Sequence, residues 1–115
     1  MTVESVREFC LSLKAVTESF PFDEDTLVFK VMGKIFVLMS LEERRINLKC
    51  DPELAIALRE EYPSVIPGYH MNKKYWNTVL LDGSVPDKRI REWIVHSYQL
   101  VVEGLPKRLR KKINS

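Results

Sequence analysis

Hydrophobic residues near the start of the chain recur at the spacing of an α-helix. Steps of three and four residues relate Val3, Val6, Phe9, Cys10 and Leu13. A stripe of this kind predicts an amphipathic helix whose apolar side faces a core. Thr2 can cap the first turn with its side chain, and Pro21, which has no backbone N–H, excludes helix in the stretch "ESFPFDED".

The next part of the chain is rich in β-branched and aromatic residues, and two turn sequences interrupt it. Gly33 in "MGK" predicts a tight turn, and the charged "LEERR" predicts a second turn. Three antiparallel strands are therefore expected near residues 27–32, 34–40 and 45–50.

The third of these strands alternates between apolar and polar residues. One side carries Ile46, Leu48 and Cys50, and the other carries Arg45, Asn47 and Lys49. Successive side chains of a strand point to opposite faces of its sheet. We therefore expect one face to be covered and the other to be at least partly in contact with water.

Helix signals return in the second half of the chain. Asp51 before Pro52 predicts a helix start, and the segments "SVIPGYHM" and "YWNTVLL" predict two short strands. A long helix is expected over residues 86–103, with Gly104 as its terminator. The order is α-β-β-β-α-β-β-α, which predicts a two-layer α+β domain over residues 1–105 with an antiparallel sheet and helices on one face. Residues 106–115 are expected to form a basic C-terminal tail.

Composition narrows the class of protein. The 115 residues are 45% hydrophobic and 30% charged, as in a globular domain. No run of about 18 apolar residues predicts a membrane span. The N-terminal stretch lacks the residue order of a signal peptide, and Cys10 and Cys50 belong to no CxxC or Cys/His cluster. A cytoplasmic protein with buried, reduced thiols is expected.

Charge is distributed unevenly along the chain. Residues 1–68 hold 8 Lys and Arg against 12 Asp and Glu, whereas residues 69–115 hold 10 against 4. The basic second part suggests a polyanionic partner. A solvated basic face with a basic tail is the simpler alternative.

The sequence offers little for catalysis. His70 and His96 are the two bases of the usual kind, and neither lies in a nucleophile motif such as GxSxG. The sequence has neither a phosphate-binding GxxxxGK[ST] nor a GxGxxG, and no Cys/His/acid group has the spacing of a metal site. The protein is therefore expected not to be an enzyme and to need no cofactor or metal.

The stretch "PGYHMNKKYW", residues 67–76, combines imidazole, amide, ammonium and aromatic groups. His70 can donate and accept hydrogen bonds, Asn72 offers an amide, and the two lysines at 73 and 74 suit phosphates. A structural alternative stays open, in which His70 and Asn72 satisfy backbone groups of an irregular turn. For Trp76 the favoured interpretation is an inward-facing core anchor.

This stretch resembles the hallmark segment of the MmcQ/YjbR family of small bacterial proteins. The matching positions are His70, Met71, Asn72, Lys73, Tyr75 and Trp76. The "INLKC" strand before "DPE" and "SYQLV" at residues 97–101 resemble two further family segments, so the likeness covers roughly residues 3–105. It implies an antiparallel sheet with helices on one side, similar to secretion-chaperone-like folds. The family has also been likened to a "double wing" DNA-binding domain, an analogy of fold only.

From the residues and this resemblance, we expect a DNA-binding protein that contacts phosphates through a basic sheet face and a basic tail. The candidate contacts are Lys30, Arg45, Asn47, Lys49, His70, Asn72, Lys73, Lys74, Lys107, Arg108 and Arg110. Two alternatives remain open. One is a protein- or peptide-binding module, a homodimer through the sheet included, and the other is a small-ligand binder around His70 and Trp76.

Overall fold

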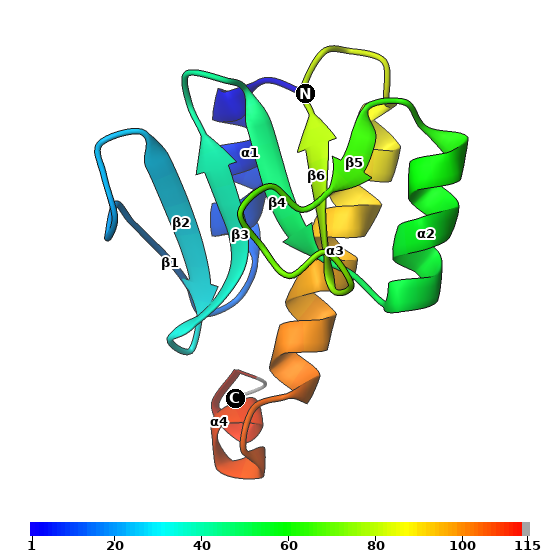
Figure 1. Ribbon diagram of the computed structural model, residues 1–115. Coiled ribbons are helices and arrows are strands. Elements are labelled where there is room, and N and C mark those ends of the chain that lie inside the picture. Colours follow the sequence, from blue (N-terminus) through cyan, green and yellow to red (C-terminus); the bar gives the residue numbers. More distant parts are fainter. Residues whose placement is uncertain (114–115) are drawn as a thin grey trace.

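A six-stranded antiparallel sheet forms the centre of the structure, a computed structural model in which residues 1–113 are described (Figure 1). The strands lie in the order β1-β2-β3-β4-β6-β5. In chain order the elements are α1 (Val3–Ser12), β1 (Val16–Ser19), β2 (Thr26–Val31), β3 (Lys34–Ser40), β4 (Arg45–Lys49), α2 (Pro52–Glu61), β5 (Val65–Pro67), β6 (Trp76–Leu80), α3 (Asp87–Glu103) and α4 (Lys107–Ile113).

The helices begin and end where their capping residues allow. Thr2 forms a capping box with Ser5 at the start of α1, and Asp51 accepts two backbone N–H bonds at the start of α2. Pro86 precedes α3, and Gly104 follows its last residue. These boundaries confirm the helix signals in the sequence.

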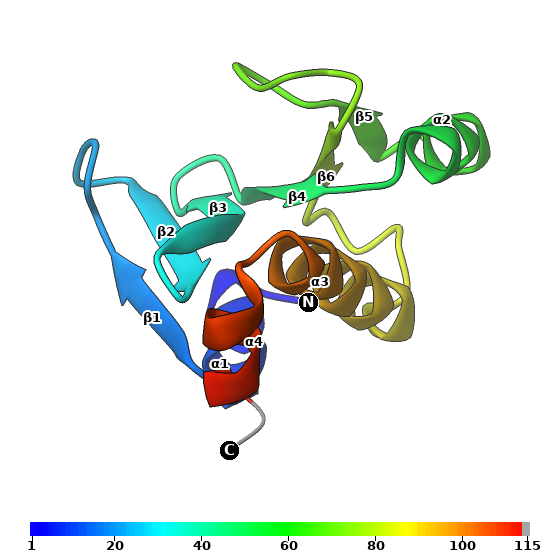
Figure 2. The same cartoon turned by 90° about the horizontal axis from the view of Figure 1, so that it is seen from below.

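All helices lie on one side of the sheet, as Figure 2 shows for α1, α3 and α4. The helix α2 packs on the same face near the β5 edge, since Ala55 and Leu58 join the core and the Asn77 amide donates to the Ala55 carbonyl over 3.2 Å. Asn77 is paired with the buried Leu48 and so shares its face. The other face, here called the open face, has no helix on it within residues 1–113. The predicted two-layer α+β fold is confirmed.

The core lies between the sheet and the helices. Its largest fully buried side chains include Phe29, Phe36 and Met39 from the sheet and Ile90 and Ile94 from α3. Burial of this apolar surface is the main favourable contribution to folding. Within the described part of the chain, no helix is both long and apolar enough to cross a membrane.

The structure adds two elements to the predicted order. Val16–Ser19 forms the edge strand β1, paired with β2, and Lys107–Ile113 forms the helix α4 within the predicted tail. Leu105 and Ile113 are buried in the core cluster, so α4 is held against the domain. Residues 114 and 115 of the predicted tail lie outside the described residues.

Candidate functional site

The open face carries the polar side chains of β4 at its centre. Arg45, Asn47 and Lys49 alternate onto this face, while Ile46 and Leu48 are buried on the helix face. This confirms the predicted alternation. Because no described helix covers these three residues, their surroundings depend on the loops that cross the open face.

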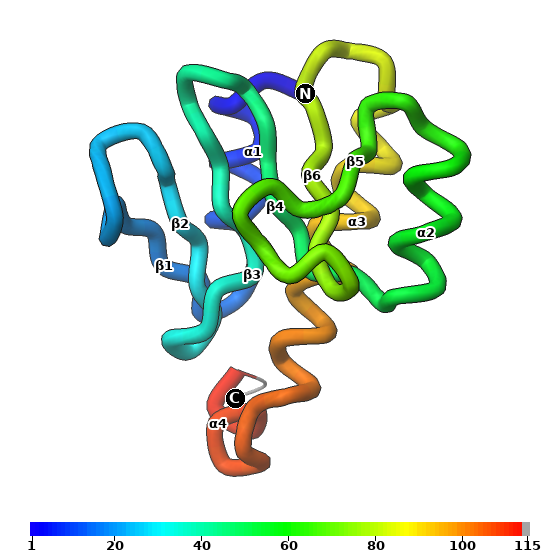
Figure 3. The backbone as a smooth tube through the Cα atoms, in the orientation of Figure 1, coloured from blue at the N-terminus to red at the C-terminus, as the bar shows by residue number. Residues whose placement is uncertain are grey.

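A loop of residues 68–75 carries most of the predicted binding motif and folds over the open face (Figure 3). Gly68 donates its N–H to the Trp76 carbonyl over 2.9 Å, and Tyr69 donates its N–H to Thr78 Oγ1 over 2.9 Å. A Cβ atom at Gly68 would lie 2.8 Å from the Trp76 Cβ, so this close approach requires glycine. The loop is therefore fixed at its start by backbone contacts.

Inside the loop, several predicted contact residues bond to the protein itself. Asn72 Oδ1 accepts the Lys74 N–H over 2.9 Å, and Lys73 Nζ donates over 3.1 Å to a carbonyl of the same loop. His70 has a backbone φ of 58°, and its ring centroid lies 4.0 Å from that of Tyr69. Within residues 1–113 the His70 imidazole makes no hydrogen bond. Asn72 therefore satisfies a backbone group of the turn, as the structural alternative expected, whereas the His70 imidazole is available to bind a ligand.

The loop and the strands enclose a groove of about 420 Å³ on the open face, here called the open-face groove. Its lining comprises Phe22, Asp23, Asp25, Thr26, Ile35, Leu38, Ser40, Glu43, Arg45, Asn47, Tyr69, His70 and Met71. The Arg45 guanidinium lies 4.0 Å from the centroid of the Tyr69 ring and bonds the Glu43 carboxylate over 2.6 Å. Asn47 Oδ1 accepts a hydrogen bond from Thr78 Oγ1, so this amide oxygen is already used.

The groove is acidic rather than basic. It contains the carboxylates of Asp23, Asp25 and Glu43 against the single guanidinium of Arg45. The backbone N–H groups of Thr26 and Asp25 lower the pKa of Asp23, so this side chain is an anion at neutral pH. A polyanion is not favoured in this groove, and the prediction of a basic sheet face is wrong for this part of it.

The cations gather instead at one end of the sheet, here called the basic end. Because neighbouring strands are antiparallel, the starts of β1, β3 and β6 and the ends of β2 and β4 lie together. Lysines at these positions are Lys14, Lys30, Lys34, Lys49, Lys73 and Lys74. The one acid in the connecting segments is Asp51, whose carboxylate caps α2. At the opposite end, the loops before β2 and before β4 hold five carboxylates against Arg44 and Arg45.

The helix α4 adds positive charge beside the basic end. It holds the predicted contacts Lys107, Arg108 and Arg110, all exposed, and lies beyond the end of the sheet in Figures 1 and 3. Figure 2 shows α4 on the helix side and the 68–75 loop on the open side. The predicted contacts Lys30, Lys49, Lys73 and Lys74 therefore share one end of the molecule with those on α4, whereas Arg45 lies at the opposite end. The predicted contacts do not form a strip along one face.

The other side chains that could take part in chemistry, one histidine and two cysteines, have structural roles. His96 Nε2 accepts the Asp51 N–H over 3.2 Å at the start of α2. Burial raises the pKa of the Cys10 thiol to about 12 and that of Cys50 to about 11. Within the described chain, no group of three or more His, Cys, Asp or Glu side chains could hold a metal ion.

Sequence reasoning missed three groups that matter here. Lys34 stands beside the β2–β3 turn, next to Gly33, a position that could have been predicted to project from the sheet end. Phe22 and Tyr69 are 65% and 47% exposed and line the open-face groove. Neither aromatic residue follows a periodic pattern, so only the path of the loops brings them together.

Comparison with known proteins places this architecture among bacterial relatives. The YjbR family model matches residues 11–100. The chain is 41% identical over 114 residues to "Uncharacterized protein YbdF" of Escherichia coli O157:H7, covering 96% of this chain and 92% of the relative. It is 36% identical over 113 residues to "Uncharacterized protein YjbR" of Escherichia coli K12, covering 96% of each chain.

Solved structures have the same fold. A crystal structure of Deinococcus radiodurans protein DR2400, which carries domain DUF419, superposes with a TM-score of 0.91 at 43% identity, covering 98% of this chain and 88% of that one. A crystal structure of a protein from Pseudomonas syringae gives a TM-score of 0.75 at 30% identity, covering 87% and 98%. The likeness extends over nearly the whole domain.

Proposed function

The chain belongs to the YjbR family, and from this premise and its charge distribution we propose that it is a nucleic-acid-binding protein, not an enzyme, that contacts phosphates through its basic end. The single observation that carries the proposal is the gathering of lysines at one end of the sheet, next to the cationic helix α4. Neutralising phosphates with Lys and Arg releases counterions, which is the main source of affinity for nucleic acid.

The β2–β3 hairpin is the element best suited to reach a nucleic acid groove. Its turn contains Gly33 and carries Lys34, both exposed, with Lys30 on the preceding strand. The helix α4 can follow the backbone on the other side of the same end. Contacts of this kind position a protein on nucleic acid without reading sequence.

Base readout is expected to be weak. The predicted amides at Asn47 and Asn72 each use their side-chain oxygen inside the protein. An amide needs both its oxygen and its nitrogen to pair with an adenine edge. Binding should therefore depend on salt far more than on sequence.

The test is a fluorescence anisotropy titration with a labelled 20-base-pair duplex from 50 to 200 mM salt. Binding at low salt should fall steeply, with a logarithmic slope of about −0.9 for each phosphate contacted. The double variant Lys34→Glu/Lys74→Glu should reduce affinity at least about tenfold, as should Arg108→Glu/Arg110→Glu, because each replaces two attractive charges by repulsive ones.

A matched control reverses two charges elsewhere. Lys88→Glu/Arg91→Glu changes two exposed residues near the start of α3, at the far end from α4. It should bind nearly as tightly as the parent protein. Absence of binding at about 50 mM salt, or equal losses in all three variants, would contradict the proposal.

A second candidate is small-ligand binding in the open-face groove. It is favoured by the groove volume, which falls in the range of ligand pockets, and by the available His70 ring. Trp76 does not line this groove, so the predicted site around His70 and Trp76 is reduced to His70 with Tyr69. A screen of uncharged aromatic compounds by protein NMR, with Tyr69→Ala as the variant that should lose binding, tests this candidate.

A further inference from the structure

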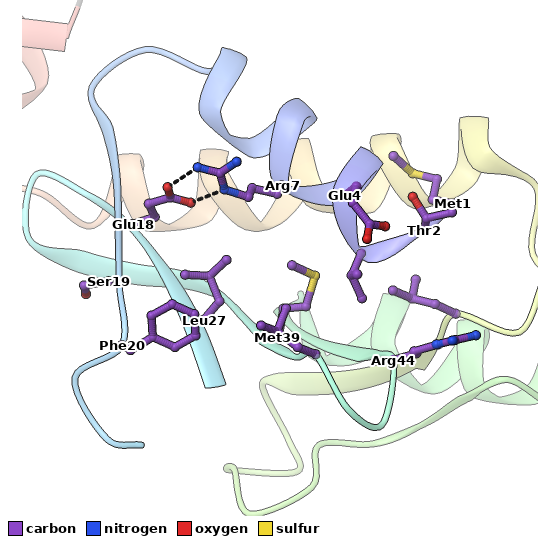
Figure 4. Close-up of a pocket in the computed structure, with 13 residues that line it drawn as sticks. Met1, Thr2, Glu4, Arg7, Glu18, Ser19, Phe20, Leu27, Met39 and Arg44 are labelled. Atoms are coloured by element: carbon purple, nitrogen blue, oxygen red, sulfur yellow. Dashed lines mark hydrogen bonds and ion pairs between the residues drawn. The ribbon is translucent and has the colours of Figure 1, made fainter. Parts of the chain in front are cut away.

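A second pocket (Figure 4) lies on the helix side of the sheet, on the opposite face from the open-face groove and at the opposite end of the sheet from the basic end. This helix-side pocket has a volume of about 920 Å³ between α1, β1 and the neighbouring strands. Leu27 and Met39, which are paired in the β2–β3 register and buried, belong to its floor. Leu41 and Leu81 extend the apolar lining.

One pair of rim charges is internally neutralised. Arg7 donates from Nε to Glu18 Oε2 over 2.8 Å and from a terminal nitrogen to Oε1 over 2.5 Å. This bidentate geometry raises the pKa of Arg7 and lowers that of Glu18. The pair joins α1 to β1 and forms a wall of the pocket, so neither group is available to a ligand.

Two rim charges of opposite sign are unpaired. Neither the Glu4 carboxylate nor the Arg44 guanidinium has a hydrogen bond or ion pair within residues 1–113. The Arg44 carbonyl accepts the Leu81 N–H over 2.9 Å, which holds the Arg44 backbone in place. The backbone of Arg44 has a positive φ of 53°. Figure 4 shows the Phe20 ring towards one end of the pocket and Glu4 and Arg44 towards the other.

From this arrangement we propose that the helix-side pocket binds a small amphipathic zwitterion, an α-amino acid with a large apolar side chain being the simplest member of the class. The ligand carboxylate bonds Arg44, its ammonium group bonds Glu4, and its apolar body covers Leu27 and Met39. A simple carboxylate would face the unpaired Glu4, and a simple amine would face the unpaired Arg44. Only a ligand with both charges neutralises both residues.

Three probes with the same aromatic body test the proposal. L-phenylalanine carries both charges, 3-phenylpropanoate only the carboxylate, and 2-phenylethylamine only the ammonium group. Titration of 15N-labelled protein, followed by NMR, should give the lowest Kd for L-phenylalanine, at least about fivefold below the other two. The shifted resonances should include those of Leu27, Met39 and Leu41.

Two variants separate the charged contacts. Arg44→Asn, which retains a side chain tolerant of positive φ, should weaken L-phenylalanine and 3-phenylpropanoate about fivefold and leave 2-phenylethylamine unchanged or tighter. Glu4→Gln should weaken L-phenylalanine and 2-phenylethylamine instead. Arg108→Gln, on the distant α4, is the matched control and should change none of the three.

The outcomes are decisive in both directions. Preference for the zwitterion together with the crossed pattern of losses supports the site. Equal affinity for all three probes, shifts confined to other residues, or no saturable shift at 10 mM of any probe would overturn it. These measurements contain no nucleic acid, so their outcome is independent of the function proposed for the basic end.

Discussion

Trp76 of β6 is paired directly with Lys49 of β4 across the antiparallel register. Paired residues share a face, and Lys49 alternates with the buried Leu48, so the indole leaves the sheet on the open face. Trp76 is half-buried there, beside Gly68, and does not belong to the core cluster. The expectation of an inward-facing core anchor is wrong, because Val79 is paired with the buried Ile46 and so faces the core, and Trp76, three positions earlier in the same strand, falls on the opposite face.

The core tryptophan is Trp93 in α3, and replacing it should be the more damaging change. Its indole is 8% exposed and packs edge-to-face on Tyr62, with ring centroids 5.1 Å apart. Trp93→Ala should lower the free energy of unfolding by about 3–5 kcal/mol, whereas Trp76→Ala should lower it by about 1–2 kcal/mol. Urea unfolding followed by circular dichroism measures both. A larger loss for Trp76→Ala would mean that the indole is a core residue after all.

Ser97 joins the long helix to two strands and should be sensitive to the loss of one oxygen. The hydroxyl is fully buried, donates to the Phe36 carbonyl over 2.6 Å and accepts the Lys49 N–H over 3.0 Å. Ser97→Ala leaves both backbone groups without that partner and should cost about 1–3 kcal/mol in unfolding free energy. Ser12→Ala, at an exposed position, is the control and should stay within about 0.5 kcal/mol. Equal effects of the two changes would refute the bridging role.

Most of the fold could be predicted because local signals agree with the global arrangement. The caps at Thr2 and Asp51 mark real helix starts, and the alternation around Ile46 marks a real strand. The edge strand β1 was missed because its four residues are only partly buried and show no apolar run. The helix α4 was missed because its basic composition resembles a tail, although Ile113 anchors it.

The candidate site was less predictable than the fold. The cluster at the basic end depends on strand register, which brings Lys30, Lys34 and Lys49 to one end from separate segments. The internal bonds of Asn72 and Lys73 depend on the three-dimensional path of one loop. Neither the clustering of the lysines nor the internal bonds of the loop can be predicted from residue spacing. Residue type alone therefore suggested that the Asn72 amide is free to bind a ligand, although its oxygen is already bonded within the protein.

The two thiols should resist modification in the folded protein. Burial raises the pKa of Cys10 to about 12 and that of Cys50 to about 11, so both are protonated at pH 8. The thiolate is the reactive form. We expect a thiol reagent such as Ellman's reagent to label neither cysteine of the folded protein over minutes at pH 8. In denaturant, the same reagent should label both cysteines rapidly. Rapid labelling of the native protein would show that one thiol becomes exposed by local opening.

Asp82 should make stability depend on pH in the acid range. The Ser84 hydroxyl and N–H donate to its carboxylate over 2.6 and 3.0 Å, and the buried Ser64 hydroxyl donates over 2.8 Å. These bonds lower the pKa of Asp82 in the folded state below the ordinary value of about 3.9. A lowered folded pKa stabilises the protein above the unfolded value, and this contribution is lost as pH falls through the folded value.

Asp82→Asn should therefore be less stable than the parent protein at pH 7, and the difference should shrink as pH falls below about 3.9. Thermal unfolding from pH 7 to pH 2.5 measures it. Glu103→Gln is a suitable control, because the Glu103 carboxylate makes no hydrogen bond or ion pair within residues 1–113 and its removal should leave the pH profile unchanged. A difference for Asp82→Asn that stays constant to pH 2.5 would mean that the loss of stability does not come from the carboxylate charge, and no difference at pH 7 would mean that the serine hydroxyls bond the amide equally well.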